Sequence, residues 1–293
     1  MNPARRGVSS AADMNLTERH PPAKINLLLH ITGHRPDGFH ELDTIFIRTS
    51  LCDRLEIRRA DHGKINLSCP ASGLSSGPDN LVVRAAELFS RRTGRDDGFD
   101  IRLEKHIPAG GGLGGGSADA ASTLDALNEL CDQPLTRDDL LALAAELGSD
   151  APFFLGPPVA RGTGRGEILT PVEAAGLPGR ALLVNPGFGV PTPWAYAAYR
   201  ALPQHQKRGE VNAEFPWGQM RNDLEPAVFG KYLLLPRLKS WLRNRPETTA
   251  AMMSGSGATM FALLAPDADV RAVQLDLRAT FGHGCWSHEV RLG

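Results

Sequence analysis

The sequence predicts an α+β protein built from two units. Apolar residues recur with a period of two in some segments and of about 3.6 in others, a pattern typical of strands mixed with helices. The chain has 293 residues, enough for one large or two ordinary hydrophobic cores. Proline and glycine become frequent between Gly156 and Gly189, which suits a change of domain. We therefore expect an N-terminal unit over residues 21–170 and a C-terminal unit over residues 171–293.

The first unit is expected to contain several short strands. Segments rich in Ile and Leu, separated by Gly, Pro or Asp, predict strands at residues 24–31, 42–49, 54–58 and 64–69. Phe99, Ile101 and Leu103 alternate with charged residues, so another strand leads directly into a glycine-rich run.

Three helices are expected in the same unit. Asn80 opens the amphipathic segment NLVVRAAELFSRR. Ser117 is a good N-cap for the segment ADAASTLDALNEL that follows the glycine-rich run. Thr136 and Asp139 resemble a capping box at the start of TRDDLLALAAEL, which ends before Gly148.

The second unit is predicted to have an antiparallel sheet with helices. Its predicted strands are residues 180–185 and 286–292, with the segment 251–265 running around a turn. Its predicted helices are residues 193–202, 231–242 and 269–281.

The composition argues against several classes of protein. The 32 basic and 33 acidic residues give a net charge of -1, so no overall field favours nucleic acid or anionic lipid. No run approaches the roughly 18 apolar residues of a membrane span. The four cysteines lie far apart without a CxxC pair, which argues against a disulfide or zinc framework and favours a reducing cytoplasm. Residues 1–20 have no apolar leader segment, and we expect them to be disordered, with Met14 as a candidate start.

The glycine-rich run from Pro108 to Ala118 reads PAGGGLGGGSA and lies between a predicted strand and a predicted helix. Backbone N–H groups leading into a helix N-terminus bind anions, and side chains would block the approach, so phosphate is the expected ligand. A flexible linker is the alternative, but such linkers seldom lie between a strand and a capped helix. The missing lysine excludes a Walker-type loop, and the position in the chain argues against a dinucleotide fold.

The segment PAGGGLGGGSADAA resembles the phosphate loop of the small-molecule kinases that include galactokinase, homoserine kinase, mevalonate kinase and phosphomevalonate kinase. Three further stretches, AKINLLLHITGHRPDGFHELDTIF, LGSDAPFF and MSGSGATMFAL, narrow the match. They resemble the branch of this family that phosphorylates the 2-hydroxyl of a cytidylated methylerythritol in the non-mevalonate route of terpenoid biosynthesis. The resemblance runs from about Pro22 to the end of the chain.

The resemblance implies a ribosomal-S5-like ATP-binding domain followed by a ferredoxin-like domain, with the active site in the cleft between them. It implies ATP and Mg²⁺ as cofactors and the cytidylated methylerythritol as substrate. The protein is expected to be a monomer or homodimer without nucleic-acid or membrane partners. Two alternatives are another kinase of the family, of homoserine or mevalonate type, which should lack DGFHE, and a non-enzymatic S5-like binding module, which would need a basic face.

Phosphoryl transfer to an alcohol needs a polarised hydroxyl, a proton acceptor and positive charge around the phosphate oxygens. By resemblance, Asp150 in LGSD is the general base, and Lys24 in AKIN orients the hydroxyl and stabilises the developing charge. In isolation, such a lysine is usually a solvated strand residue, and such an aspartate is usually a turn residue.

The nucleotide contacts implied by the resemblance come from three places. Main-chain N–H groups of the glycine loop would hold the α and β phosphates, with Ser117 facing the β and γ phosphates or Mg²⁺ as the one possible protein ligand. Gly255 and Gly257 in SGSG would form a second glycine loop. Asn80, Leu81 and Lys105 would contact the adenine, although Asn80 could be only a helix cap and Leu81 only a core residue. The cofactor-binding set in the first loop is Pro108, Ala109, Gly110, Gly111, Gly112, Leu113, Gly114, Gly115, Gly116, Ser117 and Ala118.

Substrate recognition is implied for the DGFHE and VPTPWAY stretches. Phe39 and His40 stand where Tyr-His is commoner in the family, so any contact made by the tyrosine hydroxyl is absent. Cytosine would stack between Phe39 and Tyr196 while His40 contacts its edge. Asn26 and Thr192 would add hydrogen bonds to the substrate.

A metal site formed by His30, His34 and His40 is a competing interpretation of the first stretch. Gly33 and Pro36 prevent that stretch from being helical, and no acidic general base lies inside it, which argues against a metal there. The HGCWSH segment near the C-terminus is better interpreted as a turn that enters the last strand.

Overall fold

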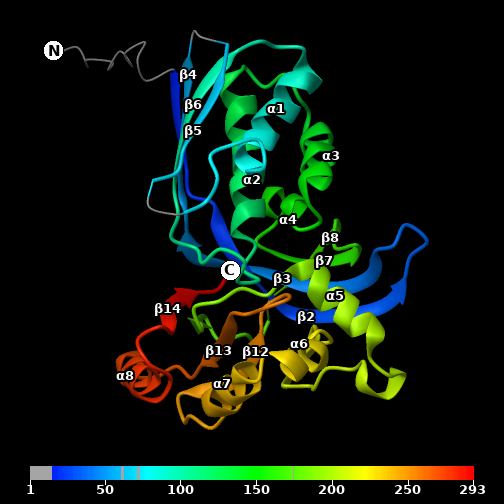
Figure 1. Ribbon diagram of the computed structural model, residues 1–293, viewed down its shortest axis with the longest axis vertical. Helices are drawn as coiled ribbons and strands as arrows, with labels where there is room; N and C mark the ends of the chain where they lie inside the picture. The colour runs from blue at the N-terminus through cyan, green and yellow to red at the C-terminus, as the bar shows by residue number, and fades with distance from the viewer. Residues whose placement is uncertain (1–14, 61–62, 71–72, 174) are drawn as a thin grey trace, which may run out of the picture.

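Three sheets follow one another from top to bottom in Figure 1, which shows the computed structural model. The structure describes residues 15–60, 63–70, 73–173 and 175–293. The helices of these residues pack at the upper and lower ends, and the longest strands cross the middle. None of these helices has the length and apolarity that crossing a membrane requires.

The upper sheet has strand order β1-β4-β6-β5, and its helices pack together on one face (Figure 1). Alternate residues of its strands, including Leu55, Ile57 and Phe99, are fully buried against these helices. The strands are β1 (Leu16–Arg19), β4 (Arg54–Ala60), β6 (Gly98–Glu104) and β5 (Ile65–Ser68). The helices are α1 (Leu81–Thr93), α2 (Gly115–Leu130), α3 (Arg137–Leu147) and the short α4 (Ala151–Leu155).

The expectation of a disordered segment up to residue 20 is wrong for Leu16–Arg19. This segment pairs antiparallel with β4 because its backbone extends the edge of the upper sheet, and Thr17 is buried there. Residues 1–14, including Met14, lie outside the described residues.

The central sheet has strand order β10-β11-β2-β3-β7-β8. The predicted strands 24–31 and 42–49 belong to a long antiparallel hairpin, β2 (Pro22–His34) and β3 (His40–Cys52). The strand β11 joins β2 in parallel, so a segment of the C-terminal unit completes a sheet of the N-terminal unit. The remaining strands are β7 (Val159–Gly164), β8 (Ile168–Pro171), β10 (Ala213–Phe215) and β11 (Gly218–Asn222).

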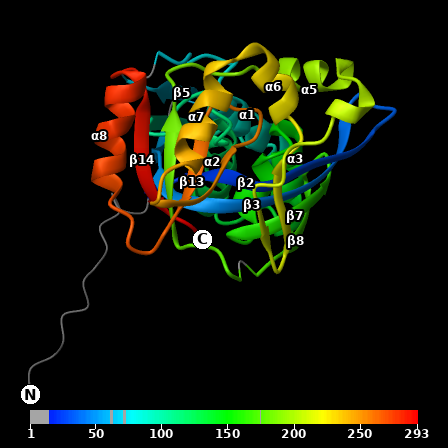
Figure 2. The same ribbon diagram turned by 90° about the horizontal axis from the view of Figure 1, so that it is seen from below.

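The lower sheet has the spatial order β12-β13-β9-β14 with antiparallel neighbours. When the strands are numbered by their order along the chain, the spatial order is 2-3-1-4. Helices follow the first strand, β9, and the third strand, β13. This is the βαββαβ arrangement of a ferredoxin-like unit, as predicted. The strands are β9 (Arg180–Asn185), β12 (Thr248–Met253), β13 (Met260–Leu264) and β14 (Trp286–Arg291). The helices, seen from below in Figure 2, are α5 (Thr192–Ala201), α6 (Glu225–Lys231), α7 (Leu234–Arg243) and α8 (Val270–Phe281).

Both faces of the lower sheet are buried. Leu182 and Val184 of β9 belong to the core formed with the helices, whereas Leu183 faces a core shared with β2 and β3. On the β2 side, Ile25 and Leu27 complete that shared core. Because side chains alternate along a strand, Lys24 and Asn26 point to the opposite face of β2. A single strand thus presents an apolar face to the lower sheet and a polar face to the cleft.

Two local predictions differ from the structure. The expected helix over residues 231–242 is divided, because α6 ends at Lys231 and α7 begins at Leu234. Ser117 is not an N-cap, since α2 begins two residues earlier and its N-cap is Gly114. The backbone of Gly114 has φ = 71°, a left-handed conformation that glycine adopts without strain, so the chain can enter the helix before it reaches the serine.

The two glycine loops meet where the units join. The N–H group of Thr259 donates to the carbonyl of Gly111 at 3.1 Å, and the Ser254 hydroxyl donates to the carbonyl of Gly112 at 2.9 Å. A Cβ atom on Gly112 would lie 2.2 Å from the carbonyl oxygen of Ser254, and the φ of Gly112 is +77°. No side chain can be accommodated there without separating the loops.

Gly112→Ala is expected to lower the free energy of unfolding by about 1–3 kcal/mol, the usual cost of overpacking, because the added methyl group must displace backbone. Gly230→Ala is the matched control, since its Cβ would meet nothing within 4 Å. Chemical unfolding of the two variants checks the prediction. Equal stability of Gly112→Ala and wild type would show that the loops are not in this close contact.

Candidate active site

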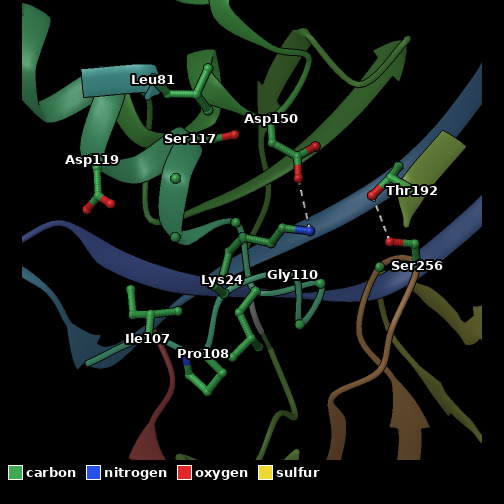
Figure 3. A pocket seen from close by; sticks show the side chains of 18 of the residues that line it. Lys24, Leu81, Ile107, Pro108, Gly110, Ser117, Asp119, Asp150, Thr192 and Ser256 are labelled. Atoms are coloured by element: carbon green, nitrogen blue, oxygen red, sulfur yellow. Dashed lines mark hydrogen bonds and ion pairs between the residues drawn. The ribbon is translucent and has the colours of Figure 1, made fainter. Parts of the chain in front are cut away.

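A cleft of about 520 Å³ lies between the upper helices and the two glycine loops. Its size suits a small-molecule ligand. It brings together the polar face of β2, the start of α2, the start of α4 and the start of α5 (Figure 3). Most of the residues that the sequence analysis selected line it, namely Lys24, Asn26, Asn80, Leu81, Lys105, Pro108 to Ser117, Asp150, Thr192, Tyr196 and Gly255.

Lys24 and Asp150 form an ion pair inside the cleft, 3.1 Å between Nζ and Oδ2, which Figure 3 marks with a dashed line. The lysine side chain is only 3% exposed, whereas the aspartate side chain is 34% exposed. Asp150 is the N-cap residue of α4, but its carboxylate makes no capping hydrogen bond. Its carboxylate is therefore directed toward the lysine and the cleft rather than toward its own helix.

Asn26 holds the lysine from the same strand face. Lys24 Nζ donates to Asn26 Oδ1 at 2.6 Å, and Asn26 Nδ2 donates to Thr44 Oγ1 at 2.8 Å. The chain of hydrogen bonds ends at the carbonyl of Leu28, which accepts from Thr44 at 2.6 Å. The buried polar groups of Asn26 are thus occupied in orienting Lys24.

The glycine loop has its carbonyl groups turned toward protein. The carbonyls of Gly111, Gly112, Leu113 and Gly114 accept hydrogen bonds from Thr259, Ser254, Lys24 and Ala118. In contrast, no backbone N–H group from Gly110 to Ser117 donates to any residue that the structure describes. The unpaired donors line the cleft at the N-terminus of a 16-residue helix, which is the arrangement that binds anions.

Ser117 is the third residue of α2 and lines the cleft. Its hydroxyl lies near the segment before Asp150, since a Cβ on Gly148 would be 3.7 Å from Ser117 Oγ. Figure 3 shows Ser117 and Asp150 in the same upper part of the cleft. Ala118 is fully buried in the upper core and its N–H group is bonded to Gly114, so the structure places it outside the cleft.

The second glycine loop contributes Gly255 and Ser256 to the cleft. Gly257, the other glycine of this loop, is packed against Met253 and is not among the residues that line the cleft. The Ser256 hydroxyl shares a 2.9 Å hydrogen bond with Thr192 Oγ1 across the cleft (Figure 3). Thr192 was expected to bind substrate, and the structure shows that it also connects the loop to α5.

At the far end of the cleft, Asn80 caps α1 by accepting from the N–H of Val82 at 2.9 Å, which is the alternative that the sequence left open. It also lines the cleft together with Leu81. The Lys105 ammonium is held by two buried carboxylates, those of Asp53 and Asp119. Burial, countered by Lys105 and reinforced by the charge of Asp53, raises the pKa of Asp119 to about 7.

A second cavity of about 510 Å³ adjoins the first and shares its Ser117, Asp150, Thr192 and Tyr196 walls. Phe39 and His40 line it at the tip of the β2–β3 hairpin. Asp150 therefore lies where the two cavities meet, with the glycine loop on one side and the aromatic residues on the other.

The aromatic side chains are arranged differently from the predicted stack. His40 is stacked on Tyr196, with ring centroids 5.1 Å apart and an interplanar angle of 28°. Phe39 is half exposed and lies beside the guanidinium of Arg165, 4.9 Å from the ring centroid. Burial, with the nearby charges of His34, Arg200 and Lys207, lowers the pKa of His40. Its ring is therefore neutral at pH 7 and can both donate and accept a hydrogen bond.

Sequence reasoning missed several residues of the site. Arg165 and Arg200 line the second cavity as exposed or half-exposed cations, but isolated arginines carry no signal in a single sequence. Ser256 lies between Gly255 and Gly257, which the sequence analysis assigns to the second glycine loop. This position is the only signal in the sequence that Ser256 lines the cleft. Asp53 contacts Lys105 across 52 residues of chain, and no local pattern connects them.

The histidines of the hairpin do not come together as a metal site. His30 Nδ1 lies 2.6 Å from Asp223 Oδ2, whereas His34 and His40 contact each other edge to face. Within the described ranges, no group of three or more His, Cys, Asp or Glu side chains is placed to hold a metal ion.

Comparison with known proteins agrees with this geometry. Residues 80–156 match the N-terminal domain of the GHMP kinases, and residues 200–283 match the GHMP kinase C-terminal domain. A 4-diphosphocytidyl-2-C-methyl-D-erythritol kinase of Methylacidiphilum infernorum is 42% identical over 278 residues, covering 93% of this chain and 95% of the relative. The enzyme of the same name from Burkholderia thailandensis is 41% identical over 268 residues, covering 88% of this chain and 89% of the relative.

A solved structure gives the same assignment. The crystal structure of a 4-(cytidine 5'-diphospho)-2C-methyl-D-erythritol kinase superposes with a TM-score of 0.76 at 36% identity, covering 94% of this chain and all of that one. A homoserine kinase from Cytophaga hutchinsonii superposes with a TM-score of 0.65 at 18% identity, covering 98% of this chain and 97% of that one, and shows the fold alone. The predicted α+β class, with an S5-like domain followed by a ferredoxin-like domain, is confirmed. The chain belongs to the GHMP kinases and, among them, to the 4-diphosphocytidyl-2-C-methyl-D-erythritol kinase family.

Proposed function

We propose that this protein transfers the γ-phosphoryl group of ATP to the 2-hydroxyl of 4-diphosphocytidyl-2-C-methyl-D-erythritol, a step of the non-mevalonate route to terpenoids. One observation carries the proposal: the Lys24–Asp150 ion pair lies where two cavities meet. One cavity is lined by unpaired backbone donors and the other by aromatic and basic side chains. Both substrates can therefore approach the same carboxylate from opposite sides.

ATP occupies the first cavity in this proposal, with its phosphates on the N–H groups of residues 110–117. These donors, together with the positive end of the α2 dipole, stabilise the negative charge of the phosphates. Asn80, Leu81 and Lys105 then border the adenine. Because the Lys105 ammonium is already bound by Asp53 and Asp119, its own contact with adenine would be through its stem or backbone.

Asp150 accepts the proton of the substrate hydroxyl, and Lys24 holds both the carboxylate and the transferring phosphoryl group. The lysine approaches from a buried strand, so its ammonium is fixed in position before the substrates bind. Since phosphoryl transfer has a largely dissociative transition state, holding the hydroxyl in line contributes as much as removing its proton.

Mg²⁺ bound with the nucleotide is also proposed, and Ser117 is the protein residue that fits it. Ser117 lines both cavities, and its hydroxyl makes no hydrogen bond to any residue that the structure describes. Magnesium usually takes few protein ligands and several from phosphate and water, as this site would require. When bound, it would neutralise charge on the phosphate oxygens.

The acceptor occupies the second cavity in this proposal. The diphosphate lies beside the cations Arg165 and Arg200, and the cytosine contacts Phe39, Tyr196 and the edge of His40. A planar guanidinium is well suited to phosphate oxygens. Because His40 now covers a face of Tyr196, cytosine must either displace the imidazole or stack on the opposite side of the tyrosine. Asn26 would then affect the substrate indirectly, by orienting Lys24. Thr192 would do so through its hydrogen bond to Ser256, which holds the second glycine loop.

We further propose that residues 21–170 act as the ATP-binding unit and residues 171–293 as the second kinase domain. The strand pair β10–β11 is the exception, since it completes the sheet of the first unit. A cytoplasmic location fits the four free cysteines, and a small-molecule acceptor rather than nucleic acid fits the balanced net charge of -1. Fractionation of cells that express the protein would test the location.

An assay of ADP release with ATP and Mg²⁺ tests the proposed reaction. The panel of alcohols contains the cytidylated methylerythritol, mevalonate, homoserine and galactose. Turnover is expected only with the cytidylated compound, because the second cavity has aromatic and basic side chains that the other alcohols cannot use. Equal turnover of mevalonate or homoserine would refute the proposal.

Asp150→Asn is expected to lower kcat by about two to four orders of magnitude, the usual contribution of general base catalysis, with little change in the affinity for ATP. Lys24→Ala should also lower kcat, and the double variant should be far from additive because the two side chains form one unit. Steady-state kinetics of the three variants checks this. A nearly normal kcat for Asp150→Asn would remove the residue from the proton transfer.

His40→Ala and Arg200→Gln are expected to raise KM for the cytidylated substrate about ten-fold or more while most of kcat is kept, because they contact parts distant from the reacting hydroxyl. The exposed Arg208, which does not line the second cavity, provides the matched control Arg208→Gln. Initial rates at saturating ATP give the comparison. If KM is unchanged in both site variants, the acceptor does not lie in the second cavity.

A further inference from the structure

The helix α4 follows Asp150 directly, and its backbone is held from the opposite end by Arg48 of β3. The guanidinium Nη2 donates to the carbonyl of Phe153 at 3.0 Å and to those of Phe154 and Gly156 at 2.8 Å each. Phe153 and Phe154 belong to the last turn of this five-residue helix, and Gly156 is its C-cap residue. The Phe153 carbonyl also accepts from the N–H group of Gly156 at 3.0 Å, so Arg48 adds a side-chain donor at a helix end where carbonyls lack helical partners. A cation at this end also complements the negative end of the helix dipole.

Arg48 makes no ion pair with a carboxylate in the described part of the chain. Burial, followed by the charge of Arg137, lowers the pKa of its guanidinium. A half-buried arginine without an acidic partner costs free energy, and its Nε is buried without a hydrogen-bond partner among the described residues. The contacts of Nη2 with the end of α4 offset part of that cost. The geometry is that of a cation used to hold backbone in place.

The register of the β2–β3 hairpin relates Arg48 to the proposed catalytic pair. Lys24 lies directly opposite Arg48 across the two strands, so both side chains project from the same face. Lys24 contacts Asp150 at the start of α4, and Arg48 contacts its end. Between them, Phe46 packs on Phe153 with ring centroids 5.0 Å apart. One strand pair thus holds the beginning, the middle and the end of α4.

The phosphate loop rests on the same helix. A Cβ on Gly114 would lie 2.9 Å from Phe154 Cζ and 3.0 Å from Lys24 Cγ. The loop and α4 are thus closely packed at Phe154, and a loss of the contacts at the end of α4 would be felt at its other end, where Asp150 meets Lys24. A misplacement of about 1 Å in such a site can cost roughly 100-fold in rate.

We propose that Arg48 is a positioning residue for phosphoryl transfer: by binding the terminal carbonyls of α4 it fixes the Asp150 carboxylate against Lys24. It touches no substrate. The inference rests on the proposed function, because it assigns to Arg48 an effect that passes through Asp150.

The test compares Arg48→Met, which keeps the length of the stem, with Arg48→Lys, which keeps the charge but not the three-way hydrogen bonding. The expected result is a kcat lowered about 10- to 100-fold in Arg48→Met and less in Arg48→Lys, with KM for ATP within about two-fold of wild type. The matched control is Arg161→Met. It removes an arginine of the same sheet that pairs with Asp43, and it should leave kcat unchanged.

Two measurements separate positioning from stability. Guanidinium ion at about 10–50 mM should raise the kcat of Arg48→Ala but not that of Asp150→Asn. Combining Arg48→Met with Asp150→Asn should lower kcat no further than Asp150→Asn alone. Arg48 acts through the Asp150 carboxylate, so its loss has no additional effect once that carboxylate has been replaced. Thermal unfolding of each variant shows that the protein measured is folded.

The outcomes distinguish this inference from the proposed function. If Asp150→Asn is impaired while Arg48→Met and Arg48→Lys, both folded, turn over normally, the positioning role is refuted and the proposed base stands. If the losses of Arg48→Met and Asp150→Asn multiply, Arg48 does not act through Asp150 and the inference is equally refuted. Nearly normal turnover by Asp150→Asn itself refutes the proposed base. If Arg48→Met does not fold, Arg48→Lys provides the test. A normal kcat of Arg48→Lys then refutes the positioning role.

Discussion

A buried ammonium group, that of Lys24, is the constraint on which the arrangement of the site depends. At 3% exposure its side chain has little access to water, so polar and negative groups must lie close to it. Asp150 and Asn26 meet this requirement through its side chain, and Leu113 accepts from its backbone N–H group at 2.9 Å. One residue of β2 thereby fixes the positions of α4 and of the phosphate loop. Removing its charge would leave an unpaired carboxylate at the centre of the cleft.

The two faces of the β2–β3 hairpin explain how such a residue can be held rigidly. Ile25 and Leu27 pack into the core shared with the lower sheet, where Phe261 is also fully buried. The opposite face carries the polar side chains of the cleft. Because the apolar face determines the register, a shift of one residue would turn Lys24 into the core, and this is strongly unfavourable. The packing that stabilises the fold therefore also positions the Lys24 charge, to which we assign a part in phosphoryl transfer.

The parts of the site that could be predicted are those with a local signal. Glycine repeats before a helix indicate an anion site because the unpaired donors arise from the backbone of one continuous segment. Lys24 and Asp150 were selected through motifs, and the structure brings them within 3.1 Å. In contrast, the assignment of Ser117 as a cap was wrong, since serine and a left-handed glycine are both plausible helix starts. Arg48 and Asp53 had no signal at all, because their partners lie about a hundred and about fifty residues away.

The sequence by itself determined the alternation of strands and helices, the α+β class and the glycine loop before α2, since each depends on residues that are neighbours along the chain. Only the tertiary structure decided how these pieces meet. It placed β11 beside β2, seated Ser254 against Gly112, stacked His40 on Tyr196 and set Arg48 at the end of α4. Such contacts join segments distant in sequence, and they form because buried backbone and charged groups must each find a partner once water is excluded.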